Sequence, residues 1–203
     1  LSSAASDVYK RQFTACIIFP VSILLDGSLT KIERDRIFVI YIIAFFVIFF
    51  WAAYEQAGAS LTLFAAEQTD RTIFGWEMPA SWIQSFNPFF VVILAAIMPS
   101  VWGALNKRGM EPASPTKQAI GLLLLSLGYL VICFGVKDVQ PGVKVSLIWL
   151  TGLYFIHTMG EIALSPIGLS MVNKLTPVRF ASLMMGIWYL STSTANKFAG
   201  TLG

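Results

Sequence analysis

The sequence predicts an all-α membrane protein, and two observations support this prediction. Of its 203 residues, 56% are hydrophobic and only 12% are charged, whereas soluble domains carry roughly 25% charged residues. In addition, five predominantly apolar runs are each long enough to cross a bilayer, since a helix of about 20 residues spans about 30 Å of hydrocarbon. These runs are residues 37–63, 79–105, 117–136, 145–172 and 180–202.

The N-terminal part of the chain does not fit this pattern. Residues 13–25 form an apolar run that is interrupted by Pro20 and too short to span alone, so we expect the end of a longer helix there. Residues 1–12 predict neither a helix nor a signal, and we expect a non-native or adaptor-derived segment, with a native cytoplasmic linker as the alternative. The chain has no initiator Met and no polar tail after 180–202, so we expect a fragment of a longer protein.

Basic residues are distributed unevenly between the loops. Loops on one side of the predicted membrane hold eight, which are Lys31, Arg34, Arg36, Lys107, Arg108, Lys117, Lys174 and Arg179. Loops on the other side hold three, which are Arg71, Lys137 and Lys144. Because Lys and Arg are enriched in cytoplasmic loops, we expect the first span to enter from the cytoplasm and the last to end outside. The net charge of +3 is therefore a topology signal, and we expect a lipid bilayer, not a nucleic acid, as partner.

The third run, 117–136, has the sequence of a packing helix. Gly121, Gly128 and Gly135 recur every seven residues and form one narrow stripe. Small residues in such a stripe let two helices approach closely in lipid. We therefore expect this helix to act as scaffold.

The first run, 37–63, contains a carboxylate. An ionised Glu55 near the bilayer centre costs about 2.5–3.5 kcal/mol on insertion scales, so it must face water, pair with a cation or hold a proton. In a continuous helix, Trp51, Glu55, Gly58 and Thr62 share one face. A purely structural ion pair with a residue elsewhere is the alternative.

Polar residues also cluster in three of the other runs. In 145–172, one helical face carries Tyr154, Thr158, Glu161, Ser165 and Gly168, with His157 one turn before the acid and Pro166 after it. In 79–105 the amides are Gln84 and Asn87, and in 180–202 the pair at i, i+4 is Trp188 and Thr192. The alternatives are an ion pair for Glu161, helix-packing hydrogen bonds for the amides, and a satisfied interior histidine for His157.

Four stretches within these runs resemble helices of the proton-coupled oligopeptide transporter family. Residues 49–61, 80–88, 160–170 and 185–191 are similar to its helices seven, eight, ten and eleven, and the likeness runs from about residue 29 to 203. The resemblance implies a major-facilitator fold of two six-helix bundles, of which this chain supplies helices seven to eleven. It implies that 13–36 are the end of the inter-bundle insertion with a cytoplasmic linker, and that 37–203 are the C-terminal bundle, cut before its last helix. The N-terminal bundle would then be missing.

The resemblance also implies roles for individual residues. Glu161 is expected to bind the amino terminus of a peptide, Asn87 and Gln84 its backbone, and Glu55 the coupling proton or a charge in the other bundle. Pocket or gate positions are expected at Ser165, Trp188 and Thr192, with Trp51 close by. The implied function is symport of di- and tripeptides across a bacterial inner membrane, driven by a proton gradient without a cofactor or metal.

Three other functions are weighed against this one. Some family members carry nitrate or other non-peptide solutes, but a carboxylate at Glu161 would repel an anion. A membrane enzyme is not expected, since neither a His-Glu-x-x-His pattern nor a nucleophile with a base occurs in the sequence. A non-transporting membrane scaffold is the third possibility, and it predicts no solute uptake.

Overall fold

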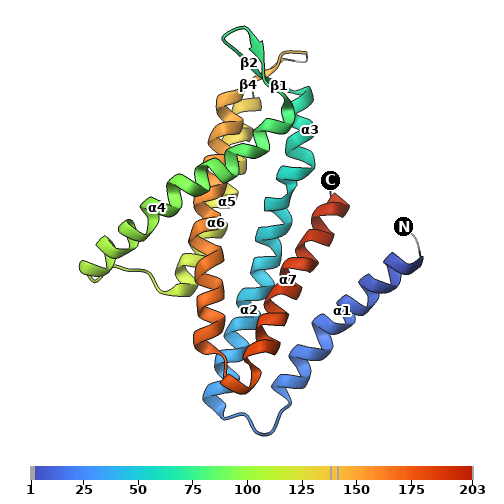
Figure 1. Cartoon of the computed structure of the whole chain (residues 1–203), viewed down its shortest axis with the longest axis vertical. Coiled ribbons are helices and arrows are strands. Elements are labelled where there is room, and N and C mark those ends of the chain that lie inside the picture. The colour runs from blue at the N-terminus through green and yellow to red at the C-terminus, as the bar shows by residue number, and fades with distance from the viewer. Residues whose placement is uncertain (1–2, 138, 141, 203) are drawn as a thin grey trace. The chain divides into compact units, whose positions relative to one another are not determined.

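The computed structural model describes residues 3–137, 139–140 and 142–202, and most of them are helical (Figure 1). The helices fall into two compact units. The first holds residues 3–53 and Gly168–Leu202, and the second holds Tyr54–Ile167. Each unit is described by itself.

The first unit contains α1 (Ser3–Leu24), most of α2 (Lys31–Tyr54), the 3-10 turn η3 (Val178–Phe180) and α7 (Ala181–Leu202). α1 packs against α7 (Figure 1). The interior is built from side chains that are less than a tenth exposed, including Ile37, Ile40, Val47, Phe50, Met184 and Trp188. These residues come from the apolar runs of α2 and α7, so burial of apolar side chains stabilises this unit.

The expectation that residues 1–12 form no helix is wrong. α1 starts at Ser3, continues through the apolar run 13–25 to Leu24, and includes Pro20. Residues 3–12 contain no Gly or Pro, so nothing in that stretch ends a helix.

The start of α2 is fixed by its own polar residues. Thr30 donates to the Glu33 carboxylate from both its backbone N–H and its hydroxyl, at 2.9 Å each, and the Glu33 N–H returns a bond of 3.3 Å to the hydroxyl. This reciprocal arrangement is a capping box, which satisfies donors left unpaired in the first turn. Arg179 adds bonds to the Ser28 carbonyl oxygen at 2.9 Å and to Glu33 at 3.4 Å.

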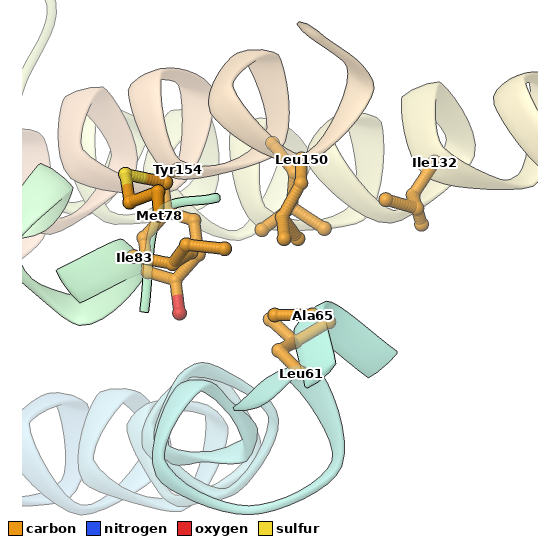
Figure 2. Close-up of a cluster of buried hydrophobic side chains, with 8 residues drawn as sticks. Leu61, Ala65, Met78, Ile83, Ile132, Leu150 and Tyr154 are labelled. Atoms are coloured by element: carbon orange, nitrogen blue, oxygen red, sulfur yellow. The ribbon is translucent and has the colours of Figure 1, made fainter. Parts of the chain in front are cut away.

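The second unit contains α3 (Ser60–Glu67), α4 (Phe86–Lys107), α5 (Ser114–Val136) and the larger part of α6 (Leu147–Leu175). Two 3-10 segments, η1 (Glu55–Gly58) and η2 (Ala80–Ser85), precede α3 and α4. Figure 2 shows its core, where side chains from α3, η2, α5 and α6 converge. The buried members are Leu61, Ala65, Met78, Ile83, Ile132, Leu150, Leu153 and Tyr154.

Short strands join the loops at one end of this unit. β1 (Thr69–Asp70) pairs in parallel with β4 (Val145–Ser146), and β2 (Thr72–Ile73) pairs in antiparallel with β3 (Trp76–Glu77). Arg71, which lies between β1 and β2, forms an ion pair of 2.7 Å with Glu77 of β3. The all-α expectation therefore holds for the spans, but it missed these four two-residue strands.

The glycine stripe of α5 packs against another helix, as the sequence predicts, and the structure identifies that helix as α6. A Cβ on Gly121 would lie 2.9 Å from the Gly160 carbonyl oxygen, and a Cβ on Gly135 would overlap the ring of Trp149. A Cβ on Gly128 would likewise overlap the imidazole ring of His157. Only glycine permits contacts this close, so the stripe sets the distance between α5 and α6.

Four of the five predicted spans are confirmed as helical segments that are long and apolar enough to cross a membrane. Within the described residues these segments are Lys31–Glu67, Ala80–Lys107, Ser114–Val136 and Leu147–Leu175. The fifth run forms a helix, α7, but it does not reach the same hydropathy. Its second half is too polar, with Ser191, Thr192, Ser193, Thr194, Asn196 and Lys197.

Candidate functional site

The candidate site begins where the first predicted span changes helix type. α2 ends at Tyr54, η1 continues as a 3-10 helix from Glu55 to Gly58, and Ala59 leaves helical geometry with φ −121° and ψ −97°. The expectation of one continuous helical face through Trp51, Glu55 and Thr62 is therefore wrong.

Side chains compensate for the backbone hydrogen bonding at this break. The Ala57 carbonyl oxygen accepts the hydroxyl of Thr62 at 2.7 Å and that of Tyr154 at 3.5 Å. Unpaired backbone groups are costly at membrane depth, where irregular backbone occurs only against protein or a hydrated cavity. The break is thus held by two hydroxyls from α3 and α6.

A hydrogen-bonded cluster lies beside the break. The Tyr54 hydroxyl donates to Oε2 of Glu161 at 2.5 Å, and Nδ2 of Asn87 donates to the same oxygen at 3.0 Å. Nδ2 of Asn87 also lies within hydrogen-bond distance of the Tyr54 hydroxyl and, at 3.4 Å, of Oγ1 of Thr158, so its two N–H donors are shared among three acceptors. The Thr158 hydroxyl in turn donates to the Tyr154 carbonyl oxygen at 2.7 Å. Two donors therefore fix the Glu161 carboxylate through one oxygen.

This cluster borders a cavity of about 210 Å³. Its walls come from η1, η2, α4, α6 and the last residue of α2. The lining residues are Tyr54, Glu55, Ala57, Gly58, Gln84, Asn87, Tyr154 and His157. Glu161 is not one of them, but it bonds directly to two of them, Tyr54 and Asn87.

The two amides predicted for the site come from the junction of η2 and α4. Gln84 lies near the end of the 3-10 turn, and Asn87 lies in the first turn of α4, followed by Pro88. Gln84 donates to Oγ1 of Thr62 at 2.8 Å. Three of the residues expected to bind the substrate or the proton, Glu55, Gln84 and Asn87, therefore line one cavity.

Glu55 itself is exposed in the cavity wall. Among the described residues it forms no ion pair and no hydrogen bond through its carboxylate. Its side chain is thus available to solvent, to a proton or to a cation.

The other residues expected at the site are placed differently. The Ser165 hydroxyl is buried without a hydrogen-bond partner in the described part of the chain, and Ser165 does not line this cavity. Trp51, Trp188 and Thr192 belong to the first unit. In that unit Trp188 is buried, whereas Trp51 and Thr192 are half-buried.

Sequence reasoning missed Tyr54 as a site residue. The signal was present, since Tyr54 is a polar aromatic residue next to Glu55 inside an apolar run. Its bond to Glu161 joins residues 107 positions apart, and nothing local to either residue predicts that pairing.

These features define a class of protein. A cavity lined by an acid, two amides and an imidazole lies among helices long and apolar enough to cross a membrane. Ionisable residues at that depth are costly and mark solute or ion pathways. The fold is that of a multi-pass membrane protein with a polar cavity, and the chain belongs to the POT family, whose model (PTR2) matches residues 7–202. The match begins at residue 7, whereas the resemblance seen in the sequence begins at about residue 29.

Curated relatives are similar over most of this chain. It is 37% identical over 179 residues to a peptide transporter, YePEPT, of Yersinia enterocolitica, which covers 87% of this chain and 35% of the relative. It is 33% identical over 167 residues to dipeptide and tripeptide permease A of Escherichia coli K12, covering 82% of this chain and 33% of that protein. The chain thus spans about a third of the length of these relatives.

Solved structures of family members are similar to this chain over nearly its whole length. A mutant peptide transporter POT in complex with alafosfalin superposes with a TM-score of 0.86 at 35% identity, over 97% of this chain and 40% of that one. A POT family transporter in complex with 5-aminolevulinic acid superposes with a TM-score of 0.87 at 29% identity, over 100% of this chain and 42% of that one. The chain is therefore an all-α membrane helical bundle that aligns with part of a POT transporter.

Proposed function

We propose that the full-length protein containing this chain is a proton-coupled symporter of di- and tripeptides, and that Glu161 binds the peptide amino terminus. This proposal rests on one observation, the hydrogen bonding of the Glu161 carboxylate. Tyr54 and Asn87 both donate to Oε2, and among the described residues no donor reaches Oε1. One oxygen is held in place while the other remains able to accept a bond from a ligand.

The chemistry of a peptide fits this arrangement. A zwitterionic peptide presents a protonated amine, and charge-assisted hydrogen bonds to a carboxylate are roughly twice as strong as neutral ones. Gln84 and Asn87 in the same cavity offer amide donors and acceptors for a peptide backbone. The cation that a peptide carboxylate needs is expected in the part of the protein outside this chain.

The proton is assigned to Glu55. An exposed carboxylate in a cavity wall, without an ion pair in the described residues, can take up a proton from water or pair with a basic residue of another bundle. In this proposal, both proton uptake and pairing with a basic residue link the charge of Glu55 to the presence of substrate in the cavity. Ser165, Trp188, Thr192 and Trp51 remain proposed pocket or gate residues.

The proposed setting is a bacterial inner membrane. The relatives in Yersinia and Escherichia carry peptide transporter and permease names, and the excess of basic residues predicts a cytoplasmic start for the first span. In this proposal the chain supplies helices seven to eleven of a major-facilitator fold, and an N-terminal bundle completes the cavity.

A second substrate class has one supporting observation. A POT family transporter that superposes closely on this chain is in complex with 5-aminolevulinic acid, which is an amino acid and not a peptide. Such a ligand still presents an amine, so the role of Glu161 would be unchanged.

Uptake by the full-length protein in proteoliposomes tests the proposal. With an inward proton gradient, wild type is expected to accumulate labelled dialanine, and Glu161→Gln is expected to reduce uptake to background, because it keeps the size of the side chain and removes its charge. Glu67→Gln at the end of α3, an exposed residue, is the matched control and should transport normally. Wild-type uptake by Glu161→Gln would refute the assignment.

A further inference from the structure

His157 is a buried imidazole beside the site, and the proposed function does not use it. It lies on α6 one helical turn before Glu161, the residue is 3% exposed, and it lines the cavity. Its Nε2 lies 3.0 Å from the carbonyl oxygen of Leu125 on α5. A carbonyl oxygen only accepts, so Nε2 carries the proton and donates it. In a neutral imidazole Nδ1 is then a hydrogen-bond acceptor.

Gly128 determines which edge of this ring faces α5. A Cβ at position 128 would overlap Cδ2 and Nε2 of His157, and a side chain there would have to displace the ring. The Cδ2–Nε2 edge of the ring therefore contacts Gly128 of α5. The opposite edge carries Nδ1 and faces away from this glycine, and His157 is one of the residues that line the cavity.

The surroundings hold the ring without occupying Nδ1. The rings of Tyr54 and Tyr129 lie against it, with centroids at 6.0 Å and 4.8 Å. Within the described residues, the bond to Leu125 is the only hydrogen bond of the imidazole. A neutral acceptor therefore stands in the cavity wall next to the fixed carboxylate of Glu161.

We propose that His157 is a substrate-binding residue, whose Nδ1 accepts an N–H from the amino end of the bound substrate next to Glu161. This rests on the proposed function, and it deepens that function by giving the amine two neighbouring acceptors. A protonated amine has three donors, and residues at i and i+4 share one helical face. An anionic group would meet a carboxylate and a lone pair here, so this end of the cavity selects the amine.

A purely structural role for His157 makes a different prediction. In that case only the bond from Nε2 to the Leu125 carbonyl matters, and the ring could be replaced by any side chain that keeps this bond. The two roles use opposite edges of the ring, so two amide substitutions separate them.

The test compares His157→Asn with His157→Gln in the full-length protein. The Asn amide lies near the position of Nδ1 and can keep the acceptor toward the cavity, whereas the longer Gln amide reaches the position of Nε2 and can keep the bond to Leu125. We expect His157→Asn to bind dialanine within about threefold of wild type. His157→Gln should bind about tenfold more weakly, which corresponds to roughly one lost hydrogen bond. Thermal stability should follow the opposite order, with Gln above Asn.

A second pair of variants leaves every side chain of the site intact. Gly128→Ala should weaken dialanine binding because its Cβ displaces the imidazole. Gly152→Ala is the matched control in the same pair of helices, since a Cβ there meets only Val131, at an ordinary 3.6 Å. It should bind as wild type does.

Calorimetric titration with dialanine and thermal denaturation of each purified protein supply the readouts. Weaker binding by the Gln variant than by the Asn variant, against the order of stability, supports the proposal. Equal binding, or binding that follows stability, overturns it. A wild type that binds no dialanine overturns the proposed function and this inference with it, whereas normal wild-type binding with the wrong order of variants overturns this inference alone.

Discussion

The hydroxyl of Tyr54 offers a direct test of how the site is held together. It donates to Glu161 at 2.5 Å and accepts from Asn87, so Tyr54→Phe removes both bonds and keeps the ring. A hydrogen bond to a charged group contributes about 1.5–3 kcal/mol, which is about 10- to 150-fold in affinity. Because Asn87 still donates to the same carboxylate oxygen at 3.0 Å, we expect the low end, an increase of about tenfold in the Kd for dialanine.

The assay is calorimetric titration of the full-length protein, with Tyr189→Phe as control. Tyr189 is exposed on α7, and its hydroxyl should not affect binding. If Tyr54 acts through Glu161, the double variant Tyr54→Phe with Glu161→Gln should bind no more weakly than Glu161→Gln alone, since coupled residues are not additive. Unchanged affinity in Tyr54→Phe, or fully additive losses in the double variant, would show that Tyr54 does not act through Glu161.

Three further predictions concern coupling, packing and a loop. Glu55→Gln should lose accumulation driven by the proton gradient yet keep counterflow of labelled peptide, and a variant that still concentrates peptide would exclude Glu55 as the proton carrier. Gly121→Ala should lower the melting temperature, because its Cβ would lie 2.9 Å from a carbonyl oxygen of α6, whereas Gly103→Ala, with nothing within 4 Å, should not. Hydrogen bonds from Thr72 lower the pKa of the exposed Asp70 below its ordinary 3.8. The hydrogen bond from the Thr72 N–H to the Asp70 carboxylate should therefore persist above pH 4 and weaken only as pH falls through the lowered pKa. The chemical shift of the Thr72 amide would report this, and a transition at or above the ordinary value would contradict it.

The helices and one of their contacts could be predicted from the sequence. Apolar length alone located α2, α4, α5 and α6, because crossing hydrocarbon demands a fixed number of residues. The seven-residue spacing of Gly121, Gly128 and Gly135 identified the face of α5 that packs. It did not identify Gly160 or His157 as the groups packed against it, since a pattern on one helix says nothing about its partner.

The break at Glu55 could not be predicted from local pattern. Residues 55–58 leave the α-helix where the Ala57 carbonyl accepts hydroxyls from Thr62 and Tyr154, and the second of these donors is 97 positions away. The same holds for the bond between Tyr54 and Glu161. The acids and amides of the site were visible because polar groups are costly in a membrane, whereas the tyrosine that organises them resembled its aromatic neighbours.

The structure of the full-length protein with a bound dipeptide would show directly which group of the peptide Glu161 binds. We expect the peptide amino nitrogen within about 3.2 Å of the Glu161 carboxylate, with the Tyr54 and Asn87 bonds to that carboxylate retained. A dipeptide bound with its carboxylate at this position, or bound away from Glu161, would contradict it.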